Sequence, residues 1–130
     1  METKRLPMGL TAEQIAAYHE VWRQRALRVD PEAEKRRARA LELVPRAAEL
    51  LRREFGATRV VLFGSLAHGD FTRWSDIDLV AWGIPSAEWL RAMSRAESVD
   101  DEIHVDLVLA QMAKDAVLEE ALKDGVAVGA

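Results

Sequence analysis

The sequence lacks cysteine altogether and has no long hydrophobic run. Without cysteine the chain forms neither disulfides nor thiolate metal sites, and this composition is typical of a protein in a reducing cytosol. No apolar stretch approaches the roughly 20 residues that a membrane-spanning helix needs. The basic residues 1–5 are not followed by the apolar segment of a signal peptide. We therefore expect a cytoplasmic protein that is not inserted in a membrane.

Basic residues are scarce in the second part of the chain. Residues 60–130 carry five Lys or Arg against thirteen Asp or Glu, a net charge of −8. Residues 1–59 carry thirteen against nine, a net charge of +4. An acidic surface attracts divalent cations such as Mg²⁺ and repels the phosphate backbone of long nucleic acids. The composition therefore argues against nucleic acid as a partner.

Hydrophobic spacing and turn residues predict helices and strands in alternation over most of the chain. Helices are expected from Thr11 to Val29, from Pro31 to Phe55 with an interruption or kink near Pro45, and over residues 65–69, 86–98 and 112–124. Strands are expected over residues 59–63, 77–82 and 103–109. Thr11 and Gln14 have the spacing of a capping box. The apolar stripe from Ile15 to Val29 either packs on the domain or makes a homo-oligomer contact.

Three aspartates interrupt apolar strands. Asp76 and Asp78 alternate at the second predicted strand and so share one face, and Asp106 lies within the third. Carboxylates on an apolar strand are costly to bury unless a cation balances them. If the two strands are neighbours, the three acids converge, and oxygen donors without cysteine suit Mg²⁺ or Mn²⁺ better than zinc. The alternative for Asp106 is a structural salt bridge with Arg73 or Arg59.

Gly64 and Ser65 end the first predicted strand. A Gly-Ser turn offers backbone N–H groups to a phosphate, although by itself it is equally consistent with a simple strand-ending turn. Together with the paired carboxylates ten residues later, it indicates a metal-dependent enzyme that acts on a nucleotide. Trp74, beside Asp76, is the tryptophan to test for contact with a base; packing is the alternative for all four tryptophans.

These residues resemble a known family. The similarity rests on four pieces of sequence, Leu62-Phe63-Gly64-Ser65, the pair Gly69-Asp70, Ser75-Asp76-Ile77-Asp78-Leu79 and Val105-Asp106-Leu107-Val108. Gly-Ser, ten residues, then Asp-x-Asp, with a later strand aspartate, is similar to the minimal nucleotidyltransferases of the DNA polymerase beta superfamily. The resemblance implies an α+β fold, a small mixed β-sheet flanked by helices. Here this core would span residues 45–130, with residues 1–44 as an N-terminal helical extension.

The resemblance also implies the site and its ligands. Asp76 and Asp78 would hold two Mg²⁺ ions, with Mn²⁺ as a substitute, and Asp106 would complete the metal site and the catalytic set. Gly64 and Ser65 would bind the phosphates of ATP. The family often has arginine where this chain has His68, and a basic or aromatic residue where it has Leu66. Both differences concern how strongly the site binds phosphate.

The activity implied by the resemblance is transfer of AMP from ATP to a hydroxyl group, with release of pyrophosphate. Related minimal proteins are antitoxins that adenylylate a HEPN-domain toxin, and such a toxin is the expected partner. Two alternatives stay open: a non-catalytic antitoxin that acts by binding its partner, and a small-molecule nucleotidyltransferase. The basic residues 35–39 are either a solvated helix face or a docking patch for an acidic partner or RNA.

Overall fold

The structure is a computed structural model that describes residues 11–129, apart from the side chains of Tyr18, Trp22 and residues 24–29. The chain divides into two compact units, residues 1–32 and residues 33–130. Within residues 11–129, none of the helices has the length and apolar composition needed to span a bilayer. The predicted functional boundary between residues 44 and 45 stays a prediction.

The first unit contains helix α1 (Ala12–Val29), which begins with the predicted capping box. The backbone N–H of Thr11 donates to Gln14 Oε1 at 2.8 Å, and the backbone N–H of Gln14 donates to Thr11 Oγ1 at 3.1 Å. Both bonds satisfy N–H groups that a helix start leaves without intrahelical partners. Most of the apolar stripe predicted on this helix lies outside the described side chains, so its role in oligomerisation stays a prediction.

Helix α2 (Pro31–Phe55) runs without a break through Pro45. The alternative of two abutting helices is therefore wrong. Pro45 lies on the exposed side of the helix, where water can bond the carbonyl oxygen that has lost its N–H partner. The opposite side carries buried apolar residues at helical spacing, among them Leu43, Ala47 and Leu51. Burial of that side offsets the cost of the proline.

The remaining elements follow the predicted order with small shifts in their bounds. They are β1 (Arg59–Phe63), α3 (Ser65–His68), β2 (Ile77–Trp82), the 3₁₀ helix η1 (Ser86–Glu88), α4 (Trp89–Glu97), β3 (Val105–Leu109), the 3₁₀ helix η2 (Ala110–Met112), α5 (Asp115–Asp124) and β4 (Val126–Ala127). Strands β1 and β2 have the predicted bounds. The sequence did not indicate β4, because two residues are too short for a period-2 pattern.

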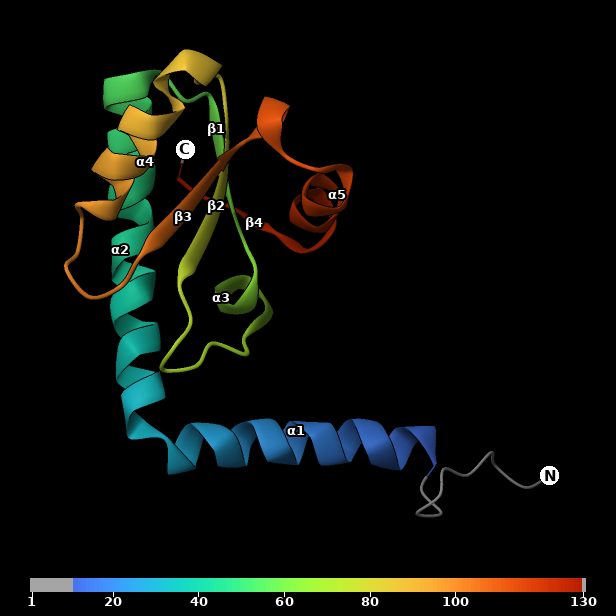
Figure 1. The fold of residues 1–130 in the computed structure, drawn as a ribbon. Helices are drawn as coiled ribbons and strands as arrows, with labels where there is room; N and C mark the ends of the chain where they lie inside the picture. The colour runs from blue at the N-terminus through green and yellow to red at the C-terminus, as the bar shows by residue number, and fades with distance from the viewer. Residues whose placement is uncertain (1–10, 130) are drawn as a thin grey trace. The chain divides into compact units, whose positions relative to one another are not determined.

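The four strands form one mixed sheet in the order β3-β2-β1-β4. Strand β1 is antiparallel to both β2 and β4, whereas β2 and β3 are parallel. Figure 1 shows α2 and α4 on one side of this sheet and α5 on the other. The structure therefore confirms the predicted α+β fold, a small mixed sheet flanked by helices.

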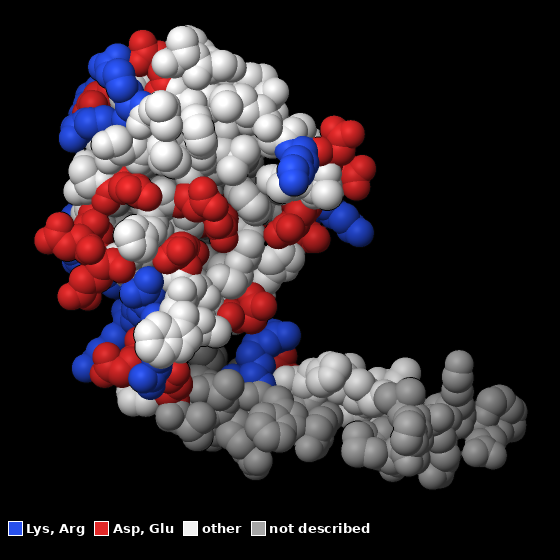
Figure 2. All heavy atoms as spheres, in the orientation of Figure 1, with Lys and Arg blue, Asp and Glu red and all other residues white. Residues whose placement is uncertain are grey.

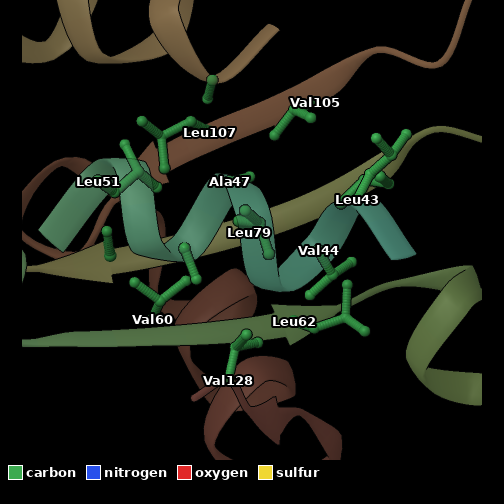
Figure 3. Packing of buried hydrophobic residues seen from close by; sticks show 14 of the residues in the cluster. Leu43, Val44, Ala47, Leu51, Val60, Leu62, Leu79, Val105, Leu107 and Val128 are labelled. Carbon is green, nitrogen blue, oxygen red and sulfur yellow. The ribbon is translucent and has the colours of Figure 1, made fainter. Parts of the chain in front are cut away.

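The main hydrophobic core lies between the sheet and helices α2 and α4. Figure 3 shows Leu43 and Leu51 of α2 among side chains from three strands, including Leu62, Leu79 and Leu107. A smaller cluster on the other face joins Val61 and Val80 to Ala121 of α5 and other residues. Because successive strand residues point to opposite faces, the residues that alternate with Leu79 and Leu107 face the α5 side. That face carries the aspartates.

Candidate active site

Asp78 and Asp106 are direct neighbours in the sheet. The parallel register of β2 and β3 pairs Asp78 with Asp106, and the next pair is Leu79 with Leu107. Adjacent strands are about 4.8 Å apart, and register partners on parallel strands point to the same face. Asp78 is partly buried and Asp106 is exposed. The structure thus brings together two of the three aspartates that the sequence singled out.

Asp76 lies immediately before β2, at the junction between loop and strand. Its side chain is 45% exposed, and its Oδ1 atom is 3.6 Å from Nη2 of Arg36 in α2. The next residue, Ile77, is held by its backbone N–H, which donates to the carbonyl oxygen of His104 at 3.0 Å. Ile77 is buried, whereas Asp76 and Asp78 on either side of it are partly exposed.

The Gly64-Ser65 turn passes directly against Asp78. Gly64 has φ +78°, a conformation that side chains disfavour, and a Cβ at this position would overlap Asp78 Oδ2. A residue larger than glycine would therefore displace the carboxylate. Ser65 begins helix α3, and Leu66, which replaces the family's usual residue, is buried in the main core. Leu66 is thus a packing residue in this chain.

Several carboxylates act together on Asp78. Burial, and to a smaller extent the negative charges of Asp106, Asp76 and Glu120, together raise the pKa of Asp78 from 3.8 to about 6. Figure 2 shows acidic side chains gathered over β3, the loop that precedes it and α5. A cation at this face would relieve the repulsion and hold Asp78 ionised.

Glu120 and His68 were not assigned a role from the sequence. Glu120 of α5 contributes to the raised pKa of Asp78, and its Oε2 atom is 3.3 Å from Nε2 of His68 in α3. This contact joins the short helix after the Gly-Ser turn to α5. Glu120 lies on a partly exposed helix with the ordinary charge pattern of a solvated face, so no sequence signal distinguishes it.

Arg36 is a further residue whose position the sequence did not reveal. It belongs to the basic run 35–39, but its side chain is only 19% exposed and reaches the loop before Asp76.

Arg59, one of the two salt-bridge partners considered for Asp106, has its guanidinium 4.8 Å from the centre of the Trp82 ring. Trp74 is 81% exposed, so a packing role does not account for it.

The donor chemistry of the aspartate face fits a divalent cation. Carboxylate oxygens are the ligands that Mg²⁺ and Mn²⁺ prefer, and their repulsion raises the pKa of Asp78. Among residues 11–129, no three His, Asp or Glu side chains are already close enough together to hold a metal ion as they stand. The backbone register fixes Asp78 and Asp106 side by side, and the Asp76 carboxylate contacts Arg36.

Comparison with known proteins is consistent with this geometry. The sequence profile of the family described as nucleotidyltransferase domain matches residues 44–128. A chain of the toxin-antitoxin MntA-HpeT, in a mutant form, is 24% identical over 65% of this chain and 69% of that chain, with a TM-score of 0.55. A chain of a toxin-antitoxin crystallised with AMP-PNP is 26% identical over 64% of this chain and 70% of that chain, with a TM-score of 0.51.

A third structure, of a protein assigned as a minimal nucleotidyltransferase, is 27% identical over 72% of this chain and 93% of that chain, with a TM-score of 0.52. No protein with a curated description matches the chain significantly. The family match covers Gly64, Ser65 and all three aspartates.

Proposed function

Because the chain belongs to the nucleotidyltransferase domain family, we propose that it transfers AMP from ATP to a hydroxyl group in a Mg²⁺-dependent reaction. The observation that carries the proposal is the pairing of Asp78 with Asp106 beside the Gly64 turn, on an acidic sheet face. A toxin-antitoxin of similar fold was crystallised with AMP-PNP, an ATP analogue, which supports a nucleoside triphosphate as substrate.

In this proposal the acceptor hydroxyl attacks the α-phosphorus of ATP, the bond from that phosphorus to the bridging oxygen breaks, and pyrophosphate leaves. Asp76 and Asp78 would hold two Mg²⁺ ions, or Mn²⁺ in their place, and Asp106 would be the third ligand. Bound divalent cations would supply positive charge at the attacking and leaving oxygens. Asp106 is exposed, and it accepts the proton of the attacking hydroxyl.

The Gly64-Ser65 turn binds the triphosphate in this scheme. The N–H group of Gly64 and the hydroxyl of Ser65 donate to oxygens of the β- and γ-phosphates. Gly64 lies against Asp78, so phosphates bound there would lie next to the aspartates. The turn therefore orients the α-phosphorus toward the acceptor.

We propose that the acceptor is a hydroxyl group of a HEPN-domain toxin and that the chain is its cytoplasmic antitoxin. The similarity to chains of toxin-antitoxin structures supports this assignment. Adenylylation of a toxin side chain would add a bulky anion to the toxin and so block its active site.

Labelled ATP tests the proposal directly. The protein is incubated with Mg²⁺, ATP labelled at the α-phosphate and the HEPN-type protein encoded in the neighbouring reading frame. We expect label on the toxin, and loss of that label for Asp76→Asn and Asp78→Asn. Asp101→Asn, the same change at an exposed aspartate outside the site, is the matched control and should label the toxin normally. Label that persists in both site variants would overturn the proposal.

A second candidate is an antitoxin that neutralises its partner by binding alone. The observation that favours it is helix α1, which precedes the residues matched by the family and belongs to a separate unit. Removal of residues 1–32 would then abolish neutralisation, whereas Asp78→Asn would not. This deletion is better than one of residues 1–44, because Ala40 and Leu43 are fully buried in the core of the second unit.

A further inference from the structure

Arg36 holds the segment that carries Asp76. Its Nε donates to the carbonyl oxygen of Ser75 at 2.9 Å, and its Nη2 is 3.6 Å from Asp76 Oδ1. One guanidinium therefore contacts both the backbone immediately before Asp76 and the Asp76 carboxylate. The two contacts join residues that are 39 and 40 positions apart in the sequence.

The loop that Arg36 contacts also contains short-range bonds. The backbone N–H of Ser75 donates to the carbonyl of Thr72 at 3.2 Å, and the backbone N–H of Thr72 donates to Ser75 Oγ at 3.0 Å. The backbone N–H of Trp74 donates to Thr72 Oγ1 at 3.2 Å. These bonds shape a compact turn but do not fix it to the helices. Arg36 supplies a long-range tie.

Arg36 lies outside the part of the chain that the family profile matches, because the profile begins at residue 44. It nevertheless belongs to the same compact unit as the aspartates, because that unit begins at residue 33. The first turns of α2 thus contribute a side chain to the candidate site.

We propose that Arg36 is a positioning residue that orients Asp76 for a divalent cation and the triphosphate. The proposal rests on the proposed function for its reaction, but its geometry stands on the two contacts of Arg36 with Ser75 and Asp76. The contact with Oδ1 and the bond to the Ser75 carbonyl together restrict both the backbone and the side chain of Asp76. Carboxylates that bind metals are commonly fixed by such hydrogen-bonded partners.

The chemistry of the guanidinium explains why arginine suits this position. Its N–H groups form a rigid planar fork that can donate to two acceptors at once. A lysine keeps the charge but has a single ammonium at the end of a flexible stem. Lysine would therefore pair with Asp76 or with the Ser75 carbonyl, without holding both in one geometry.

The test compares Arg36→Gln and Arg36→Lys with Arg37→Gln. Arg37 is the adjacent arginine, and its guanidinium is 3.9 Å from Glu34 on the same helix. Mn²⁺ affinity is measured by calorimetry without nucleotide, and kcat and KM for ATP are measured in the labelling assay. Hydrogen exchange of the peptide that covers residues 72–77 reports the order of the loop, and melting temperatures confirm that each variant is folded.

We expect Arg36→Gln to weaken Mn²⁺ affinity and lower kcat by about tenfold each, with KM for ATP within about threefold of the parent. Exchange over residues 72–77 should become faster. Arg36→Lys should show most of the same loss, and Arg37→Gln none. Parental Mn²⁺ affinity and exchange in Arg36→Gln would overturn the inference. Full recovery in Arg36→Lys would also overturn it, because charge alone would then suffice.

The readouts separate this inference from the proposed function. A parent protein that transfers no nucleotide would refute the proposed function, while Mn²⁺ affinity and exchange would still test Arg36. A parent that labels the toxin normally, together with an Arg36→Gln variant that behaves like the parent in all readouts, would refute the inference alone.

Discussion

Replacing Asp78 by asparagine should stabilise the metal-free protein while abolishing its activity. Asp78 is partly buried beside Asp106 and under the Gly64 turn, and its pKa rises from 3.8 to about 6. Above pH 6 the folded protein must therefore carry an ionised Asp78 carboxylate. The ionised form of this carboxylate has a lower free energy in the unfolded chain than in the folded protein. Asparagine has nearly the same shape but no charge, so it removes this penalty.

The raised pKa gives the magnitude and the sign of the effect. One pKa unit corresponds to about 1.36 kcal/mol, so a rise from 3.8 to about 6 corresponds to at most about 3 kcal/mol. Partial exposure to water reduces this to about 1–2 kcal/mol. Between pH 4 and 6 the folded state binds more protons than the unfolded state, so the parent loses this stability as the pH rises. Below pH 4 the carboxyl is protonated in both states and the difference disappears.

Urea denaturation in the presence of EDTA measures the effect. At pH 7.5 the free energy of unfolding of Asp78→Asn should exceed that of the parent by about 1–2 kcal/mol, a rise of roughly 3–10 °C in melting temperature. At pH 4 the two proteins should be equally stable. Asp101→Asn, at an exposed position, controls for the loss of one negative charge. A variant that is no more stable than the parent at pH 7.5, or a gain that does not depend on pH, would refute the reasoning.

Three further outcomes follow from the site and the fold. Calorimetry should show Mn²⁺ affinity falling about tenfold per pH unit below about pH 6, because protonation of Asp78 competes with the metal; an affinity independent of pH would contradict this. Gly64→Ala should cost about 1–3 kcal/mol in chemical denaturation and abolish transfer, because its Cβ would overlap Asp78 Oδ2 in a backbone conformation with φ +78°. Thr11→Ala should lower helicity in circular dichroism and cost the first unit about 1 kcal/mol, since it removes the bond to the Gln14 N–H; unchanged helicity would count against the capping box.

Most of the secondary structure could be predicted from local patterns. Strands β1 and β2 have the bounds that their apolar runs indicated, and the capping box at Thr11 and Gln14 forms as its spacing requires. Two features could not be predicted locally. The unbroken path of α2 through Pro45 depends on burial of the opposite side of the helix, and β4 exists only because β1 offers it an open edge. Both features depend on tertiary contacts and not on the local conformational preferences of the residues.

The candidate site likewise has one feature that a local pattern predicts and another that depends on tertiary structure. The alternation of Asp76 with Asp78 is a local property, because successive strand residues point to opposite faces. The proximity of Asp78 to Asp106 required a parallel β2–β3 pairing in one particular register, since a shift of one residue would have turned Asp106 into the core. The roles of the three aspartates, Gly64 and Ser65 in binding and catalysis stay predictions.

The sequence by itself determined the elements, the acidic face of β2 and the family, because these depend on spacings within short segments. Only the tertiary structure decided which distant residues surround Asp78. Glu120 of α5 acts on Asp78 through its charge and contacts His68 of α3, and Arg36 reaches the loop before Asp76 from a helix some 40 residues earlier. Contacts across such separations depend on how helices pack on the sheet, and no local pattern of residues encodes that packing.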